Sequence, residues 1–167
     1  MDDPPDRGES RAPHLQDLVD LCKALNREGT RYLLIGGFAV ILHGFVRGTK
    51  DVDLLVDPSE ENIRTVKRAL SSLPDNAAAL LADDEMLRYP VVRVADEIVV
   101  DLLRAACGIP YTEAIQGGVD RFKVQDVEIP VAGKHLLIRM KDTVRESDAV
   151  DVRFLRMRIE EEEKGRS

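Results

Sequence analysis

Two aspartates, Asp51 and Asp53, stand one residue apart at the head of an apolar segment that ends at Val56. Successive side chains of a β-strand alternate between its faces, so residues i and i+2 lie on the same one. Aspartate is depleted in strands, and two like charges on one face repel unless a cation neutralises them. The alternative is a pair of surface aspartates at a strand edge. We expect a strand whose acidic face holds a hard cation, for which carboxylate oxygens are suitable ligands.

A Gly-Gly turn precedes this strand. An apolar segment, Tyr32 to Ile35, leads into Gly36-Gly37, and a helix is expected from Phe38 to His43. Glycines at such a turn are often needed only for tight backbone geometry. However, the N–H groups and the dipole of a helix start also attract phosphate. The turn and the acidic pair together predict a site that holds a metal ion against a nucleotide.

Three further residues extend this prediction. Asp101 lies in a second apolar segment, Ile98 to Leu103. Alone it would be a hydrogen-bonding residue at a strand end, but with the acidic pair it completes the three-carboxylate cluster that two-metal phosphoryl-type transfer requires. Arg47 and Thr49 lie just before the pair. A guanidinium there can clamp phosphate, or it can be an exposed loop arginine.

Bulk composition limits the alternatives. The chain has 167 residues, enough for one domain with a real core, and its net charge of -7 argues against broad, unspecific duplex binding. Aromatic residues make up 4% with no Trp, which disfavours a stacking platform for single strands. Neither a signal peptide nor a membrane span is apparent, and Cys22 and Cys107 are far apart, so a cytoplasmic protein is expected.

Hydrophobic periodicity predicts an α/β (α+β) fold, a small mixed β-sheet flanked by helices with a helical C-terminus. Residues 1–12 are expected to be a flexible N-terminal segment, and residues 13–163 a single domain. The expected helices are 15–25, 38–43, 59–73, a short one at 77–81, and 133–163 with a break near Glu146-Ser147. The expected strands are 32–35, 52–56, 91–94, 98–103, 122–124 and 127–131.

These motifs resemble a known family. Gly36-Gly37, Asp51-x-Asp53 and a strand-borne Asp101 resemble the nucleotidyltransferase superfamily that includes DNA polymerase β. More narrowly, the segment 34–53 is similar to stand-alone bacterial nucleotidyltransferases of the abortive-infection toxin and lincosamide nucleotidyltransferase types. The tail Lys141…Arg145-x-x-Asp148-x-x-Asp151 resembles a helical segment of the toxin group. Together the motifs span about residues 32–155, with Lys141, Arg145 and Asp148 expected on one helix face.

The resemblance implies a minimal nucleotidyltransferase fold that transfers a nucleoside monophosphate from an NTP to an acceptor hydroxyl, with release of pyrophosphate. Asp51, Asp53 and Asp101 would be catalytic and would bind Mg²⁺. The nucleotide would be bound by Gly36, Gly37, Arg47, Thr49, Lys141 and Asp148. Many members have Gly-Ser where this chain has Gly36-Gly37, so phosphate contacts at residue 37 would come from backbone N–H groups.

The acceptor is left open by the sequence: an RNA end, a protein or a small molecule all fit the pattern. The short chain makes a homodimer or an antitoxin partner plausible, because little sequence remains for a separate acceptor domain. The alternative function is a non-catalytic nucleotide-binding or regulatory protein of the same fold, for example within a toxin–antitoxin pair.

Overall fold

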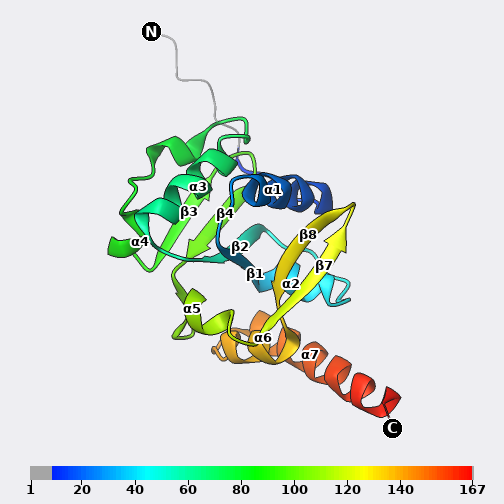
Figure 1. Ribbon diagram of the computed structural model, residues 1–167. Coiled ribbons are helices and arrows are strands. Elements are labelled where there is room, and N and C mark those ends of the chain that lie inside the picture. Colours follow the sequence, from blue (N-terminus) through cyan, green and yellow to red (C-terminus); the bar gives the residue numbers. More distant parts are fainter. Residues whose placement is uncertain (1–8, 167) are drawn as a thin grey trace.

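A mixed β-sheet forms the centre of the computed structural model, which describes residues 9–166 (Figure 1). Within that range the sheet has six strands in the order β3-β4-β2-β1-β8-β7. The strands are β1 Tyr32–Ile35, β2 Asp51–Val56, β3 Val91–Ala95, β4 Val99–Leu103, β7 Val119–Val124 and β8 Val127–Ala132. A separate two-stranded ribbon pairs β5 Ala105–Ala106 with β6 Ile109–Pro110. The predicted mixed sheet, flanking helices and helical C-terminus are confirmed.

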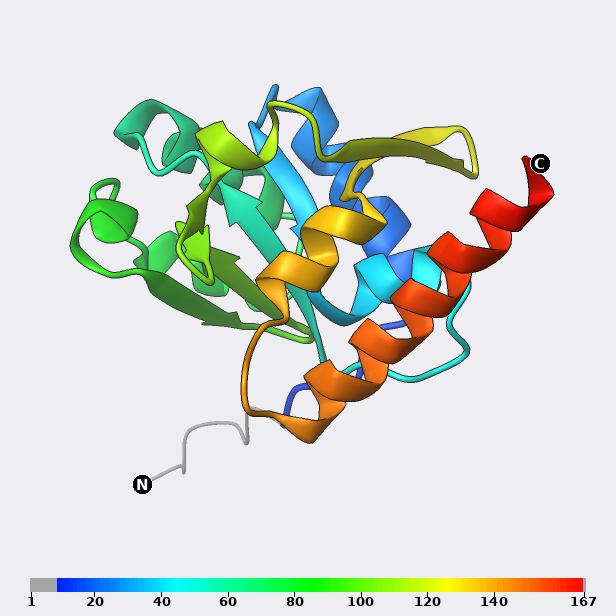
Figure 2. The same ribbon diagram turned by 90° about the horizontal axis from the view of Figure 1, so that it is seen from below.

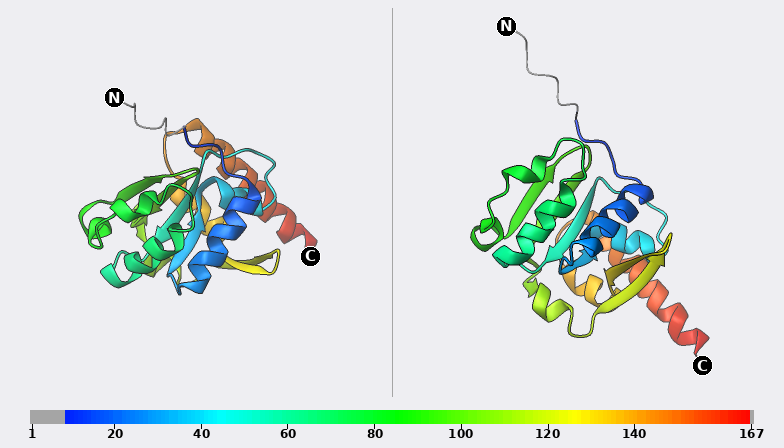
Figure 3. Two further views of the ribbon diagram at one scale, coloured as in Figure 1. Left: turned by 90° about the horizontal axis from the view of Figure 1, so that it is seen from above. Right: turned by 45° about the horizontal axis from the view of Figure 1, so that its top comes forward.

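Helices cover both faces of the sheet. Helices α1 (Leu15–Arg27) and α3 (Glu60–Leu70) lie side by side across one face (Figure 3). Helices α6 (Lys134–Met140) and α7 (Glu146–Gly165) cross the opposite face, and the C-terminal end of α7 extends past the sheet (Figure 2). The shorter helices are α2 Gly36–Leu42, the 3₁₀ turn η1 Ala77–Leu80, α4 Glu85–Arg88 and α5 Tyr111–Ala114.

Side-chain alternation in β2 separates the core from the site. Val52 and Leu54 are fully buried, and strand alternation turns them to the face that α1 and α3 cover. Asp51 and Asp53 point to the opposite face, toward α6 and the start of α7. Leu18 and Leu25 of α1 are completely buried, as expected for the apolar stripe of an amphipathic helix. The buried face therefore supports the strand whose other face carries the acids.

Two of the differences from the sequence prediction concern the site. The C-terminal helix breaks at residues 141–145, earlier than Glu146-Ser147, so Lys141 ends α6 while Arg145 precedes α7. The two therefore do not share a helix face. The break has a local cause: the Thr143 hydroxyl accepts the Arg145 N–H at 3.2 Å and donates to Asp148, and such side-chain bonds compete with helical ones. Asp101 lies in the middle of β4 rather than at a strand end.

The predicted flexible segment, residues 1–12, lies mostly outside the described residues. In the part that is described, the Ser10 hydroxyl donates to the Asp96 carbonyl at 2.6 Å, and the Arg11 N–H donates to the Glu97 carbonyl at 2.9 Å. Residues 10 and 11 are therefore placed against the β3–β4 turn. Over residues 9–166, no helix has both the length and the apolarity that crossing a membrane requires.

Candidate active site

Strand register brings the three predicted acids together. In the parallel pair β2–β4, Asp53 lies directly opposite Asp101, and residues so paired project from the same face. Asp51 precedes Asp53 by two residues and shares that face. One carboxylate oxygen from each of the three lies within 4.8 Å of the others. Such an all-oxygen donor set suits a hard divalent cation.

The electrostatics of the cluster favour a bound cation. Burial, and then the neighbouring charges of Asp51 and Asp101, raise the pKa of Asp53 to about 7. Burial, followed by the charge of Asp101, also raises the pKa of Asp51. A raised carboxyl pKa means that the ionised form is destabilised in the folded protein. The cluster therefore retains protons near neutral pH unless positive charge is supplied to it.

The glycine turn is shaped by these acids. Gly36 has φ +71, and a Cβ built on it would lie 2.1 Å from Oδ2 of Asp53. A Cβ on Gly37 would lie 2.7 Å from Oγ1 of Thr49. Only glycine leaves room at both positions without a shift of these side chains. The absence of a serine at residue 37 thus has a steric reason, because the Thr49 hydroxyl already occupies that space.

Replacing Gly36 with alanine is expected to displace the Asp53 side chain and to strain the positive-φ backbone. We expect a loss of about 1–3 kcal/mol in stability and at least a tenfold loss in Mn²⁺ affinity. Chemical denaturation and calorimetric titration measure the two effects. Gly48→Ala is the matched control, since nothing lies within 4 Å of a Cβ built there. Equal Mn²⁺ affinity in both variants would contradict the close-packing argument.

A cavity of about 570 Å³ adjoins the acids. It lies between the loop before β2 and the start of α7. Its lining includes five of the six residues predicted to bind the nucleotide, namely Gly37, Arg47, Thr49, Lys141 and Asp148, together with the predicted metal ligand Asp51. Gly36 does not line the cavity but packs against Asp53. The structure therefore places the acids and the predicted nucleotide-binding residues around one continuous region.

A buried carboxylate binds two of the cationic side chains that line this cavity. Asp151 of α7 is 2% exposed and contacts Nη1 of Arg47 with both oxygens, at 2.5 and 2.6 Å. Nζ of Lys141 lies 2.9 Å from Asp151 and 3.4 Å from Asp148. Two cations from distant segments are thus held together by one helix. Asp151 belongs to the tail motif, but the sequence did not predict a role for it, because its partner Arg47 is 104 residues away.

Arg93 is a site residue that the sequence prediction missed. It lies on β3, the outer strand of the sheet, directly opposite Asp101. Its Nε and Nη2 donate to the two carboxylate oxygens of Asp101 at 2.9 and 3.0 Å, and Nη2 lies 3.6 Å from Asp51. The predicted hairpin of residues 91–94 and 98–103 puts the two residues on neighbouring strands, but only the observed register places residue 93 across from residue 101.

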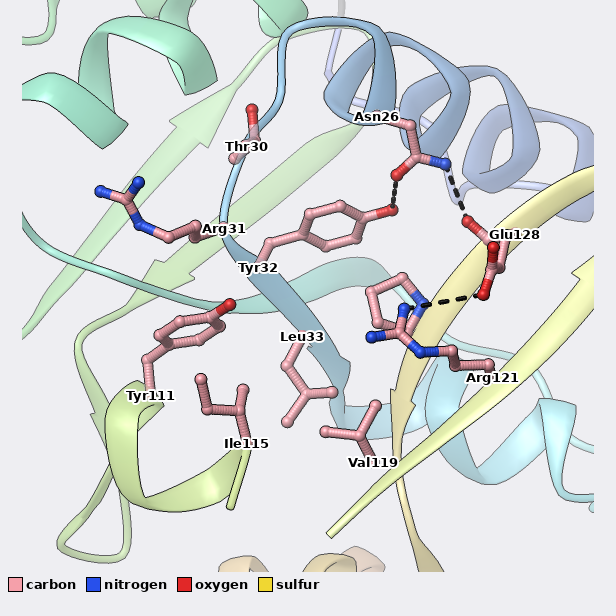
Figure 4. A pocket seen from close by; sticks show the side chains of 11 residues that line it. Asn26, Thr30, Arg31, Tyr32, Leu33, Tyr111, Ile115, Val119, Arg121 and Glu128 are labelled. Atoms are coloured by element: carbon pink, nitrogen blue, oxygen red, sulfur yellow. Dashed lines mark hydrogen bonds and ion pairs between the residues drawn. The ribbon is translucent and has the colours of Figure 1, made fainter. Parts of the chain in front are cut away.

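A second cavity, of about 500 Å³, lies at the other end of β1, where β1 and β8 diverge (Figure 4). Four of its polar residues are paired with one another. The Tyr32 hydroxyl donates to Asn26, Asn26 donates to the Glu128 carbonyl, and Arg121 lies 3.6 Å from the Glu128 carboxylate. It shares no lining residue with the acid cluster.

Comparison with known proteins supports the fold. A solved structure of a "putative nucleotidyltransferase" from Thermotoga maritima superposes with a TM-score of 0.51 at 16% sequence identity. The match covers 88% of this chain and 92% of that one. The chain therefore has the nucleotidyltransferase fold. No protein-family description matches the sequence, and no curated protein matches it either.

Proposed function

We propose that the protein is a metal-dependent nucleotidyltransferase that moves a nucleoside monophosphate from an NTP to an acceptor hydroxyl. The observation on which this rests most is the cluster of Asp51, Asp53 and Asp101, three carboxylates on one sheet face beside a cavity lined by lysine and arginine side chains. A shared fold alone does not establish a reaction. The donor set and its neighbours supply the chemical argument.

The three aspartates fit a divalent cation, since each offers an oxygen and their ionised forms are destabilised without positive charge. We assign Mg²⁺, the usual partner of carboxylates and phosphates, to Asp51, Asp53 and Asp101. When bound, it would supply charge neutralisation at the reacting phosphate.

The cavity residues would bind and orient the triphosphate. Lys141 and Arg47 offer positive charge, and the guanidinium can make bidentate contacts with phosphate oxygens. The backbone N–H groups of Gly36 and Gly37 begin α2 beside the acids. Thr49 packs against Gly37, and Asp148 holds the amino group of Lys141. This arrangement would keep the α-phosphate near the carboxylates.

In the proposed reaction the acceptor hydroxyl oxygen attacks the α-phosphorus in line with the bond to the bridging oxygen. That bond breaks and pyrophosphate leaves with its electron pair. Asp101, which lies on the side of the cluster nearer the outer strand β3, is the candidate acceptor of the hydroxyl proton. Positioning and electrostatic stabilisation would supply most of the rate enhancement.

The acceptor remains a choice among an RNA end, a protein hydroxyl and a small molecule. A homodimer or an antitoxin would be a reasonable partner, since the exposed half of α7 extends past the sheet. A cytoplasmic location also belongs to the proposal, since both cysteines, Cys22 and Cys107, are free thiols. A non-catalytic role in a toxin–antitoxin pair is the alternative function.

Labelled NTPs, Mg²⁺ and a cell extract test the proposal directly. We expect transfer of label by the wild-type protein and at least a hundredfold loss in Asp51→Asn, because an electrostatic contributor at the reacting centre is removed. Asp126→Asn is the control, as its side chain is 97% exposed at the β7–β8 turn. Transfer unaffected by Asp51→Asn would exclude the metal site. Failure of the wild-type protein to bind Mg²⁺–nucleotide or to label anything would favour the non-catalytic role.

A further inference from the structure

We infer that Arg93 is a built-in cation that occupies Asp101 and limits the resting site to one divalent ion. This inference rests on the proposed metal-dependent function and concerns the regulation of that same site. Four residues lie in one row across the sheet, in the order Arg93, Asp101, Asp53 and Ile35 on β3, β4, β2 and β1. Cross-strand pairing therefore places the guanidinium beside the acids without help from any loop.

The contacts of Arg93 are selective among the three acids. Its Nε and Nη2 engage both oxygens of Asp101, the fork geometry in which a guanidinium binds a carboxylate most strongly. Nη2 also approaches Asp51 at 3.6 Å. Within residues 9–166, Arg93 forms ion pairs with Asp51 and Asp101 but not with Asp53. Asp101 is therefore the acid whose oxygens are already engaged, while Asp53 stays available to a metal ion.

Charge balance agrees with this division. Once a bound metal ion has displaced the protons of the cluster, three ionised carboxylates and one guanidinium leave two net negative charges, which one divalent ion neutralises. A second divalent ion would bring excess positive charge unless Arg93 withdrew or a triphosphate arrived. Like charges at such separations repel, which disfavours the second ion while the guanidinium remains.

The position of Arg93 allows it to leave. Its side chain is 62% exposed, whereas that of Asp101 is 11% exposed, so the guanidinium can move into solvent while the carboxylate stays in place. Because β3 is the outer strand of the sheet, no further strand of the described residues confines the arginine on that side. Arg93 thus acts as a positioning and gating residue at the third carboxylate. Over residues 9–166 its ion pairs are with Asp101 and Asp51, and Asp51 also lines the cavity.

Counting bound Mn²⁺ by calorimetry and by electron paramagnetic resonance tests the inference without any measurement of activity. We expect one site per chain in the wild-type protein and two in Arg93→Gln, with the second site at least tenfold tighter than any residual second site of the wild type. Arg88→Gln is the matched control, because it removes an equally charged, 53% exposed arginine that pairs with Asp84 and Glu85 instead. It is expected to retain one site.

A second site in the wild type as tight as that of Arg93→Gln, or one site in Arg93→Gln, would overturn the inference. Thermal unfolding with and without Mn²⁺ checks that the variant folds, and we expect the Mn²⁺-induced rise in Tm to be larger for Arg93→Gln than for the wild type. The two proposals fail differently. If the wild-type protein transfers label but Arg93→Gln binds the same number of Mn²⁺ ions as the wild type, only the proposed role of Arg93 is excluded. No Mn²⁺ binding by any variant would remove the metal-dependent function as well.

Discussion

Replacing Asp53 with asparagine is expected to abolish nucleotide transfer and, in the metal-free protein, to increase the free energy of unfolding above pH 7. The first effect follows from loss of a central carboxylate of the cluster. The second follows from burial and neighbouring charges, which raise the pKa of Asp53 from 3.8 to about 7. The folded protein therefore destabilises the ionised side chain, and the neutral amide removes that cost.

The sign of the pH dependence is fixed by the same shift. Between about pH 4 and 7 the folded protein holds a proton on Asp53 that the unfolded chain has released. Stability must therefore fall as pH rises through this window, because the folded state binds more protons. A shift of about three pKa units corresponds to about 4 kcal/mol, and sharing among the three acids reduces the contribution of Asp53 to about 2–4 kcal/mol.

Urea denaturation without metal at pH 5 and pH 8 measures this effect. We expect the wild-type protein to be less stable at pH 8 than at pH 5, with a clearly smaller difference in Asp53→Asn. Asp126→Asn is again the control, since its exposed carboxylate lies far from the cluster. Addition of Mg²⁺ at pH 8 should stabilise the wild type and leave Asp53→Asn unchanged. A variant with the same pH dependence as the wild type would refute the electrostatic account of the cluster.

The acid cluster was predictable because local patterns determine it. Asp51 and Asp53 share a face by the two-residue period of a strand, and Asp101 is an acid within an apolar strand. Only the register of β2 against β4 was needed to bring the third acid to the pair, and that register follows from packing the apolar face. Strong, short-range periodicity also explains why the mixed sheet and its main helices were predicted.

Long-range pairings explain what the sequence did not reveal. The ion pair between Arg47 and Asp151 joins the loop before β2 to the last helix, and no local spacing relates them. The break between α6 and α7 depends on the hydrogen bond from the Thr143 hydroxyl to Asp148, which helical periodicity does not predict. Arg93 was predicted on the strand next to Asp101, but the observed register, with Ala95 opposite Val99, was needed to pair the two. It was missed because a lone arginine on an edge strand is usually a solvated one.

The second large effect is expected at Asp151, where replacement by asparagine should destabilise the protein by about 2–4 kcal/mol. The carboxylate is 2% exposed and contacts both Arg47 and Lys141, so the variant leaves two cations without their shared anion. Removing one partner of a buried ion pair is costly because the remaining charge stays desolvated. The expected loss of stability is smaller than the largest losses seen for buried ion pairs, because the Arg47 side chain is 27% exposed and can regain water.

The loss should be concentrated in α7, since few other buried groups hold that helix. Its buried residues are Asp148, Asp151 and Leu155, and the ring of Phe154 packs against Phe45 at 4.6 Å between centroids. Hydrogen exchange should therefore accelerate in residues 146–157 more than in the sheet. Glu163→Gln removes a carboxylate from the exposed end of the same helix and is expected to change neither stability nor exchange.

A double-mutant cycle separates this electrostatic role from simple packing. If Asp151 acts by pairing with Arg47, then Arg47→Gln should cost much less in the Asp151→Asn background than in the wild type, with a coupling energy of about 1–3 kcal/mol. Additive losses would show that the two residues stabilise the fold independently. The cycle also bears on nucleotide binding, because Arg47 and Lys141 line the cavity that Asp151 underlies. Loss of the Asp151 carboxylate should raise the KM for the NTP more than it lowers kcat, since the three aspartates of the cluster remain in place.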